Sequence, residues 1–175
     1  MVAEAAIAIG LVVSADRVAD VRIASTRRTD VAALFVGRSA EQVLALLPTL
    51  FALCGTAQTM AGLAAIEAAT GQRVVPAQIA ARRLLVLAEI VAEHGTAIAR
   101  DWPKLAGAEP ELGLAKELRA GLSGMRLGLY PAGDWKCLGG GALQPDRPAL
   151  MAALVMTVMR AERIMGAGSG ERRLV

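Results

Sequence analysis

The spacing of apolar and polar positions changes character along the chain. Residues 5–13 alternate roughly between the two kinds, and residues 18–25 alternate again after the polar, turn-like segment Ser14–Arg17. A period of two residues is typical of a strand with one face covered. The pattern therefore predicts an antiparallel β-hairpin near the N-terminus, and residues 32–37 add a short third strand.

From residue 39 onward the pattern becomes helical. Ser39 and Gln42 have the spacing of a capping box, which opens a helix toward Leu53. Pro48 within it predicts a kink or a break. A second helix is predicted over 57–69, where a stripe of alanines allows another backbone to come close. Gly71 should end this helix, because glycine readily takes the left-handed conformation that follows a last turn.

The clearest predicted helix covers residues 77–100, with Pro76 in its first turn and Pro103 beyond its end. Its polar side chains fall on one narrow stripe and its large apolar ones on the opposite side, which predicts a solvated charged face. The polar stripe comprises Arg82, Glu89, Glu93, Thr96 and Arg100, and the apolar side comprises Leu84, Leu87, Val91 and Ile98. His94, the single histidine, falls on the apolar side, where a buried histidine is expected.

Two more helices complete the predicted order, over 111–122 and over the methionine-rich segment 147–165. The glycine-spaced residues 121–141 between them are predicted to be irregular. Residues 166–175 are predicted to form a flexible tail. The expected fold is α+β and mostly α, with an N-terminal antiparallel hairpin or small sheet (about 5–36) packed on a helical bundle (about 39–165). One domain over 1–165 is expected.

Composition adds expectations about partners. The 175 residues suffice for one core, and they are 55% apolar but only 3% aromatic. Alanine buries little area per residue. Such a core therefore favours closely packed helices and a chain that is stabilised by a partner surface, for example in a homodimer. The net charge of +3 is spread over scattered arginine pairs. With so few aromatic side chains for stacking, the sequence argues against nucleic-acid binding.

Cysteine usage and the N-terminus favour the cytoplasm. Two cysteines 83 positions apart do not form a secreted disulfide framework, and the first apolar run lacks a preceding basic residue, unlike a signal peptide. Residues 42–66 are uncharged and long enough for one membrane span. Because polar residues, glycines and a proline interrupt them, two buried helices joined near Cys54 fit better, and the single span is kept as an alternative.

The two cysteines and the histidine are the candidate reactive or metal-binding residues. Cys54, followed by Gly55 in an apolar stretch, fits a buried core cysteine, a nucleophile with His94 as its base, or a metal ligand. Together with Cys137 these residues fall one ligand short of a tetrahedral structural zinc site. The triple glycine 139–141 lacks the Lys and Ser/Thr of a phosphate loop, so it predicts a flexible loop. The methionines of the last predicted helix favour adaptable packing.

The order of these features resembles the N-terminal part of the large subunit of nickel–iron hydrogenases. The resemblance runs from about Ile7 to Trp102 and rests on "LCGT", "AIEAATG" and "RRLLVLAEIVAEHGTAIARDW". Where that family has a second cysteine, a histidine and an arginine, this chain has Ala57, Ala61 and Ala52. The family's C-terminal Asp-Pro-Cys-x-x-Cys motif is also missing from the sequence. A site held by four thiolates cannot form. Hydrogenase activity is therefore not expected, and the chain is not expected to be an enzyme.

Large-subunit-like proteins with decayed motifs resemble this chain better, namely the HupK-type hydrogenase maturation proteins. That resemblance implies a non-catalytic scaffold or carrier for the iron–cyanide–carbonyl part of the nickel–iron site. Cys54, beside Gly55, would be a transient thiolate ligand, with Cys137 and His94 as further candidate metal ligands. One soft ligand suits an iron fragment that must be released again, and apolar neighbours would keep water away.

The same resemblance implies hydrogenase maturation proteins, or the hydrogenase large subunit, as partners, and no permanently bound cofactor. A structural interaction module with a decayed metal site is the alternative, with Cys54 as a small buried hydrophobe.

Overall fold

The chain contains two compact groups of contacts. The computed structural model describes residues 6–26, 30–105 and 107–167. Contacts divide the chain into a unit Met1–Ser39 and a unit Ala40–Val175. The single domain over 1–165 stays a prediction. Of the expected tail, residues 168–175 lie outside the described residues, while residues 166 and 167 belong to the last helix.

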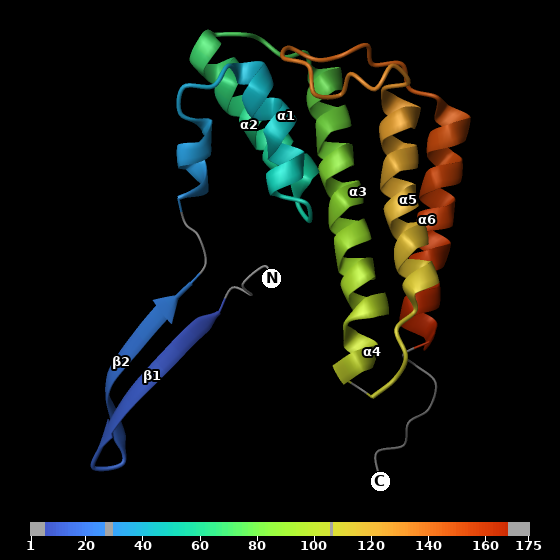
Figure 1. Ribbon diagram of the computed structural model, residues 1–175. Coiled ribbons are helices and arrows are strands. Elements are labelled where there is room, and N and C mark those ends of the chain that lie inside the picture. Colours follow the sequence, from blue (N-terminus) through green and yellow to red (C-terminus); the bar gives the residue numbers. More distant parts are fainter. Residues whose placement is uncertain (1–5, 27–29, 106, 168–175) are drawn as a thin grey trace. The chain divides into compact units, whose positions relative to one another are not determined.

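The first unit holds the predicted hairpin (Figure 1). Strands β1 (Ile7–Ser14) and β2 (Arg17–Ser25) pair antiparallel, with a register shift between Val12 and Val13. The connecting residues Ala15 and Asp16 have φ of 48° and 58°. This conformation matches a two-residue turn whose twist suits the strands.

One expectation for this unit is wrong. The third strand over 32–37 is absent, because Val31–Phe35 forms a 3₁₀ helix in which the Ala33 N–H donates to the Asp30 carbonyl at 2.9 Å. Alanine is a weak strand former, so a local turn wins here. No described element of this unit covers either face of the hairpin, so the covered face that the alternation predicts stays a prediction.

The second unit is helical throughout its regular structure. Its elements are α1 (Ala40–Leu50), α2 (Gly55–Thr70), α3 (Pro76–Arg100), the short α4 (Trp102–Leu105), α5 (Leu112–Leu129) and α6 (Arg147–Ala167). Gly71 has a φ of 68° and ends α2 as predicted, and Pro76 begins α3. Pro48 lies inside α1, which ends two residues later. The predicted fold class, α+β and mostly α, is confirmed.

The prediction that residues 121–141 are irregular is wrong over 121–129. Helix α5 continues to Leu129, and its glycines are contact points with α6. A Cβ at Gly121 would lie 2.7 Å from Thr157 Oγ1, and one at Gly128 would lie 2.8 Å from Leu150 Cδ2. These glycines therefore permit a close helix–helix approach, as small residues do at packed interfaces.

Helix α3 is turned the opposite way from the prediction. Arg82, Glu89 and Thr96 of the polar stripe are buried at 9%, 5% and 4% exposure. Leu87, from the predicted core side, is 58% exposed. The alanines interleaved with the polar stripe explain this orientation, because Ala81, Ala92 and Ala99 are buried and allow neighbouring helices to pack closely.

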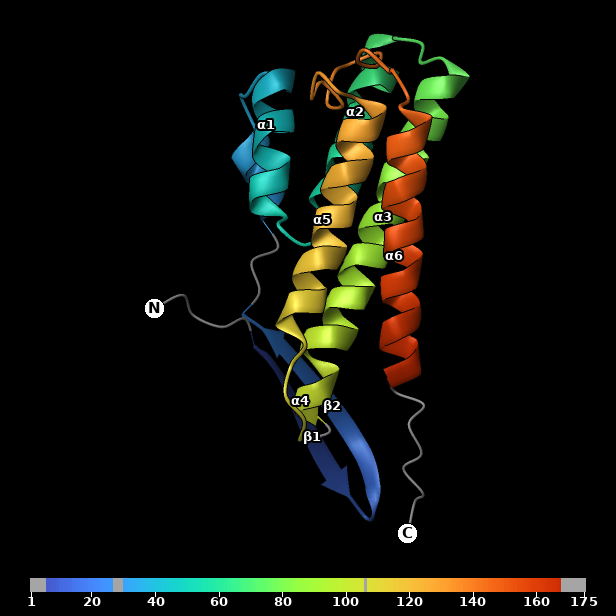
Figure 2. The same cartoon turned by 90° about the vertical axis from the view of Figure 1, so that its right-hand side faces the viewer.

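Helices α3, α5 and α6 lie side by side in both views (Figures 1 and 2). Where α3 meets α5, Leu118 is 1% exposed and packs with Ala99, Leu114 and Ala115. Gly95 of α3 faces Leu118, because a Cβ there would lie 2.6 Å from Leu118 Cδ1. In the described part of the chain, no helix combines the length and the apolar character of a membrane span.

Candidate functional site around Cys54

Cys54 occupies the N-cap position of α2. Its side chain makes no capping hydrogen bond and is exposed. The Gln58 amide nitrogen lies 3.9 Å from Cys54 Sγ, a long contact of the kind sulfur accepts. The sulfur therefore lies at the N-terminus of α2, where a molecule in solvent can reach it.

Gly55 allows α1 and α2 to meet directly beside this cysteine. Gly55 is buried, and a Cβ there would lie 3.0 Å from the Pro48 Cα. Any larger residue would push α1 away from the start of α2. The glycine that follows the cysteine thus has a structural reason to be there.

A buried glutamate from α3 caps the start of α2. The Glu89 carboxylate accepts hydrogen bonds from the N–H groups of Thr56 (2.6 Å) and Ala57 (2.8 Å). These groups belong to the first turn of α2 and have no partner within their own helix. A carboxylate at this place gains both charge-assisted hydrogen bonds and the attraction of the helix dipole. The expectation that Glu89 is solvated is wrong.

Arg126 of α5 completes this cluster. Its guanidinium donates to Thr56 Oγ1 and lies 4.0 Å from Glu89 Oε1. It also stacks 4.8 Å from the centre of the Trp135 ring. Burial lowers the pKa of Arg126, and the nearby Glu89 charge opposes that shift. Three helices and one loop therefore hold the helix turn that carries Cys54.

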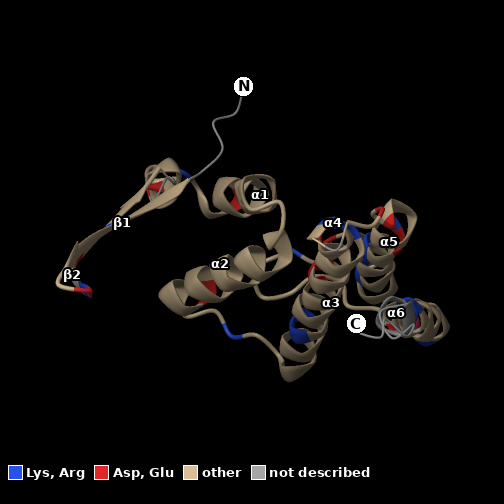
Figure 3. Cartoon of the chain, turned by 90° about the horizontal axis from the view of Figure 1, so that it is seen from below, with Lys and Arg blue, Asp and Glu red and all other residues tan. Residues whose placement is uncertain are grey.

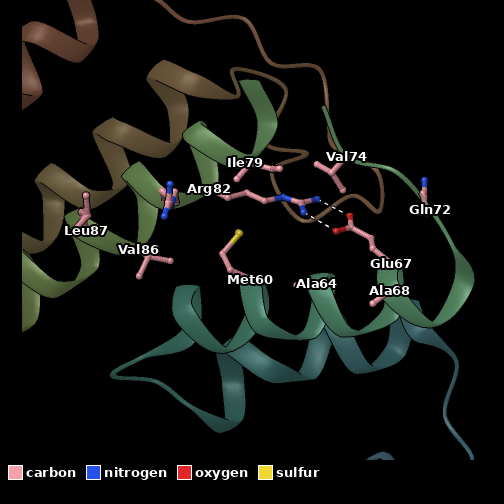
Figure 4. A pocket seen from close by; sticks show the side chains of 11 residues that line it. Met60, Ala64, Glu67, Ala68, Gln72, Val74, Ile79, Arg82, Val86 and Leu87 are labelled. Carbon is pink, nitrogen blue, oxygen red and sulfur yellow. Dashed lines mark hydrogen bonds and ion pairs between the residues drawn. The ribbon is translucent and has the colours of Figure 1, made fainter. Parts of the chain in front are cut away.

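A second polar cluster lies near the other end of α2. Arg82 donates two hydrogen bonds to the Glu67 carboxylate, both at 2.7 Å, and both side chains are buried (Figure 4). Glu67 also accepts the Gly139 N–H at 2.7 Å, and Arg82 donates to the Cys137 carbonyl at 3.3 Å. The hydrogen bond from Arg82 lowers the pKa of Glu67, against the opposing effect of burial.

The glycine-rich loop, expected to be merely flexible, is tied to α3 by its backbone. Gln78 donates to the Gly141 carbonyl at 2.7 Å and accepts from the buried Tyr130 hydroxyl at 2.6 Å. Gly140 has a φ of 113°, and a Cβ there would lie 2.4 Å from the Gln78 amide carbon. The loop needs glycine for close packing. This packing explains the glycines of the loop without a role in phosphate binding.

The structure does not bring the candidate ligands together. Cys137 is exposed, and its carbonyl contacts Arg82 beside Glu67. Glu67 is 12 residues along α2 from Gly55, which at 1.5 Å per residue is about 18 Å. Cys54 thus lies at the N-terminal end of α2, whereas Cys137 lies in a loop near its C-terminal end.

His94 is exposed, so the buried histidine expected from the pattern is wrong. It follows Glu89 by five residues, which turns it about 140° around α3 from the side that touches α2. This position argues against His94 as a base for Cys54. Among the described residues, no three His, Cys, Asp or Glu side chains cluster as a metal site would need.

Comparison with known proteins gives two partial relatives. Over 76 residues the chain is 42% identical to protein HupK of Bradyrhizobium diazoefficiens, a match covering 43% of this chain and 21% of that protein. Over 69 residues it is 39% identical to HupV of Azotobacter chroococcum, covering 39% of this chain and 20% of that protein. Both are named hydrogenase expression/formation proteins. The matches thus span about a fifth of each relative's length.

No protein-family model matches the chain, and no solved structure matches it. The chain is a partial homologue of two hydrogenase expression/formation proteins. Its likeness to nickel–iron hydrogenase large subunits stays a prediction.

Sequence reasoning placed Cys54 and Gly55 at the junction of two helices but missed the side chains that hold the start of α2. Glu89, Arg126 and Trp135 come from three separate segments, so no local pattern joins them. One signal was available. The polar stripe of α3 lies between Ala81, Ala92 and Ala99, and such small residues indicate a face packed against other helices.

Proposed function

We propose that this protein is a non-catalytic hydrogenase maturation factor that carries the iron–cyanide–carbonyl fragment of the nickel–iron site through Cys54. The observation that carries the proposal is the exposed Cys54 sulfur at the N-terminus of a firmly held helix. The printed names of the two relatives, hydrogenase expression/formation proteins, support the general role.

The donor set favours a transient cargo over a resident metal. Cys54 offers a single soft ligand, and neither His94 nor Cys137 has a position that supports joint binding with it. A resident structural metal takes several protein ligands, usually four for zinc. An iron fragment that brings its own cyanide and carbonyl ligands needs fewer protein ligands, and one thiolate can release it to an acceptor.

Exposure changes one part of the expected mechanism. The resemblance implied that apolar neighbours shield the thiolate from water, but Cys54 is exposed in this chain. A thiolate that passes its iron fragment to another protein must be accessible to that protein. In this proposal the acceptor, a maturation protein or the hydrogenase large subunit, covers the sulfur during transfer.

A maturation assay in a hydrogenase-producing host tests the role. The host strain carries Cys54→Ala or Cys137→Ala in its own copy of this protein, and hydrogenase activity is measured in each strain. We expect Cys54→Ala to lower the amount of active hydrogenase and Cys137→Ala to leave it unchanged. Both thiols are exposed, so the second variant is a matched control. Equal activity in both strains would refute the carrier role.

A structural interaction module is the second candidate function. The exposed apolar side of α3 favours it, because Leu87 is solvent-accessible while Arg82 and Glu89 of the same helix are buried. This role needs no thiolate. Normal maturation with Cys54→Ala, but impaired maturation with Leu87→Asp, would select it.

A further inference from the structure

Helix α3 leaves a row of large apolar side chains in solvent. Ile79 is 47% exposed, Leu87 58% and Ile90 45%, while Glu89 of the same helix is 5% exposed. Apolar side chains gathered on one exposed face commonly mark an interaction site. In this helix Arg82 and Glu89 have partners inside the protein, while the large apolar side chains are the ones left uncovered.

This face is hollowed. A groove of about 960 Å³ runs between α2 and α3, lined mainly by apolar side chains such as Met60 and Val74 (Figure 4). A second hollow of about 510 Å³ adjoins it along α3. Both are lined by Ile79, Arg83 and Leu87, so they form one groove.

The groove has the length of a short helix. Its α3 wall extends from Pro76 to Leu87, and these two residues lie about 17 Å apart along the helix at 1.5 Å per residue. Three turns of a bound helix cover that distance. Apolar anchors spaced i, i+4 and i+7 on one face are the usual way in which a helix occupies such a groove.

The charges at the groove are basic. Glu67, its acidic lining residue, is neutralised by the buried pair with Arg82. Arg83 lines both hollows, is exposed, and forms no ion pair with any described residue. Arg73 lies between the lining residues Gln72 and Val74 and is also exposed. Figure 3 shows a basic position in the α2–α3 connection.

A second copy of this chain is a poor occupant. Helix α6 has the exposed apolar surface to offer, with Met151 and Met159 more than half exposed. However, α6 carries three arginines and one glutamate. Docking α6 of another copy would place basic residues beside Arg83.

We propose that the groove between α2 and α3 binds an amphipathic helix of a partner protein, with apolar side chains in the groove and acidic side chains facing Arg83 and Arg73. This binding goes beyond the role of Cys54 and does not depend on it.

A pair of designed peptides tests the charge and the groove. Each labelled 16-residue helix carries leucines at i, i+4 and i+7, flanked by glutamates in one peptide and by lysines in the other. Fluorescence anisotropy measures their binding to the full chain. At low salt we expect the glutamate peptide to bind about tenfold more tightly, and this preference should shrink as salt screens the charges.

Variants locate the binding. Leu87→Asp should weaken the glutamate peptide about tenfold, whereas Leu127→Asp, at a position 60% exposed on α5, should not. Arg83→Glu should shift the preference toward the lysine peptide, and Arg17→Glu on the hairpin should leave it unchanged. Cys54→Ala should bind as the wild type does, which keeps this test separate from the carrier role. Circular dichroism checks that each variant is folded.

Three outcomes would overturn the proposal. The two peptides could bind equally well, or Leu87→Asp and Leu127→Asp could have equal effects. Alternatively, sedimentation could show a dimer that Leu87→Asp dissociates, in which case the groove is a contact between copies of this chain.

Discussion

A single buried carboxylate decides how the turn that carries Cys54 is held. Glu89 accepts two N–H groups of α2 and lies beside Arg126, so removing it would leave the N–H groups of Thr56 and Ala57 without their acceptor and Arg126 without its ion-pair partner. No other described side chain accepts those two N–H groups. The turn of α2 that carries Cys54 is therefore held in place by a residue of α3.

Replacing Glu89 by alanine should destabilise the protein strongly. We expect a loss of about 3 kcal/mol in the free energy of unfolding, because two N–H groups at the start of α2 and the partly buried charge of Arg126 are left unpaired. Glu93→Ala is the matched control, since Glu93 also lies on α3 and also pairs with an arginine of α5, but near the surface. It should cost less than about 1 kcal/mol. Urea unfolding measures both, and equal losses would contradict the proposed capping role.

The Glu67–Arg82 pair should make stability depend on acid. The pKa of Glu67 lies below its ordinary value of 4.5, chiefly because Arg82 donates to it. The folded state therefore favours the carboxylate, and the stability gained is present above pH 4.5 and lost as pH falls through the lowered pKa.

Urea unfolding of the wild type and Glu67→Gln between pH 7 and pH 3 measures this effect. The wild type should be the more stable protein at pH 7, and the difference should narrow below pH 4.5. A difference that stays constant over the whole range would show that ionisation of Glu67 does not contribute.

At the scale of elements, local signals predicted helix ends well and helix orientation badly. Gly71 and Pro76 have conformational preferences that act within one turn, so α2 and α3 end and begin where the sequence indicates. The direction in which α3 faces depends on what packs against it. There, alanine and threonine mattered more than leucine, because close packing around Ala92 and Thr96 brings Glu89 and Arg82 to their partners.

Glycine spacing was the second source of error. Gly121 and Gly128 lie inside α5 at its contacts with α6, whereas Gly139 and Gly140 lie in a true loop. Sequence alone does not separate these uses, since both need a missing side chain. Only the second pair also needs a positive φ.

Two glycine substitutions in that loop separate strain from packing. Gly133 and Gly140 both have positive φ, but a Cβ at Gly133 would meet nothing within 4 Å, while one at Gly140 would collide with Gln78. Gly133→Ala should cost about 1 kcal/mol from backbone strain. Gly140→Ala should cost about 1–3 kcal/mol more, because Gln78 must move. Equal losses in urea unfolding would show that the loop is not packed on α3.

At the scale of the whole molecule, the relation between hairpin and helices remains a prediction. An isolated two-stranded hairpin is marginally stable in water, and this one exposes Ile7, Ile9 and Ile23 at more than 60%. If residues 1–165 act as one domain, then the hairpin amides should be protected from hydrogen exchange nearly as well as those of α3. Free exchange in β1 and β2 beside a protected α3 would instead establish two independent units.

The most direct test of the carrier role is an infrared spectrum of the protein purified without oxygen from a hydrogenase-producing host. The proposal predicts bands in the cyanide and carbonyl stretching region for the wild type and for Cys137→Ala, and their loss in Cys54→Ala. The absence of these bands from the wild type, or their persistence in Cys54→Ala, would contradict it.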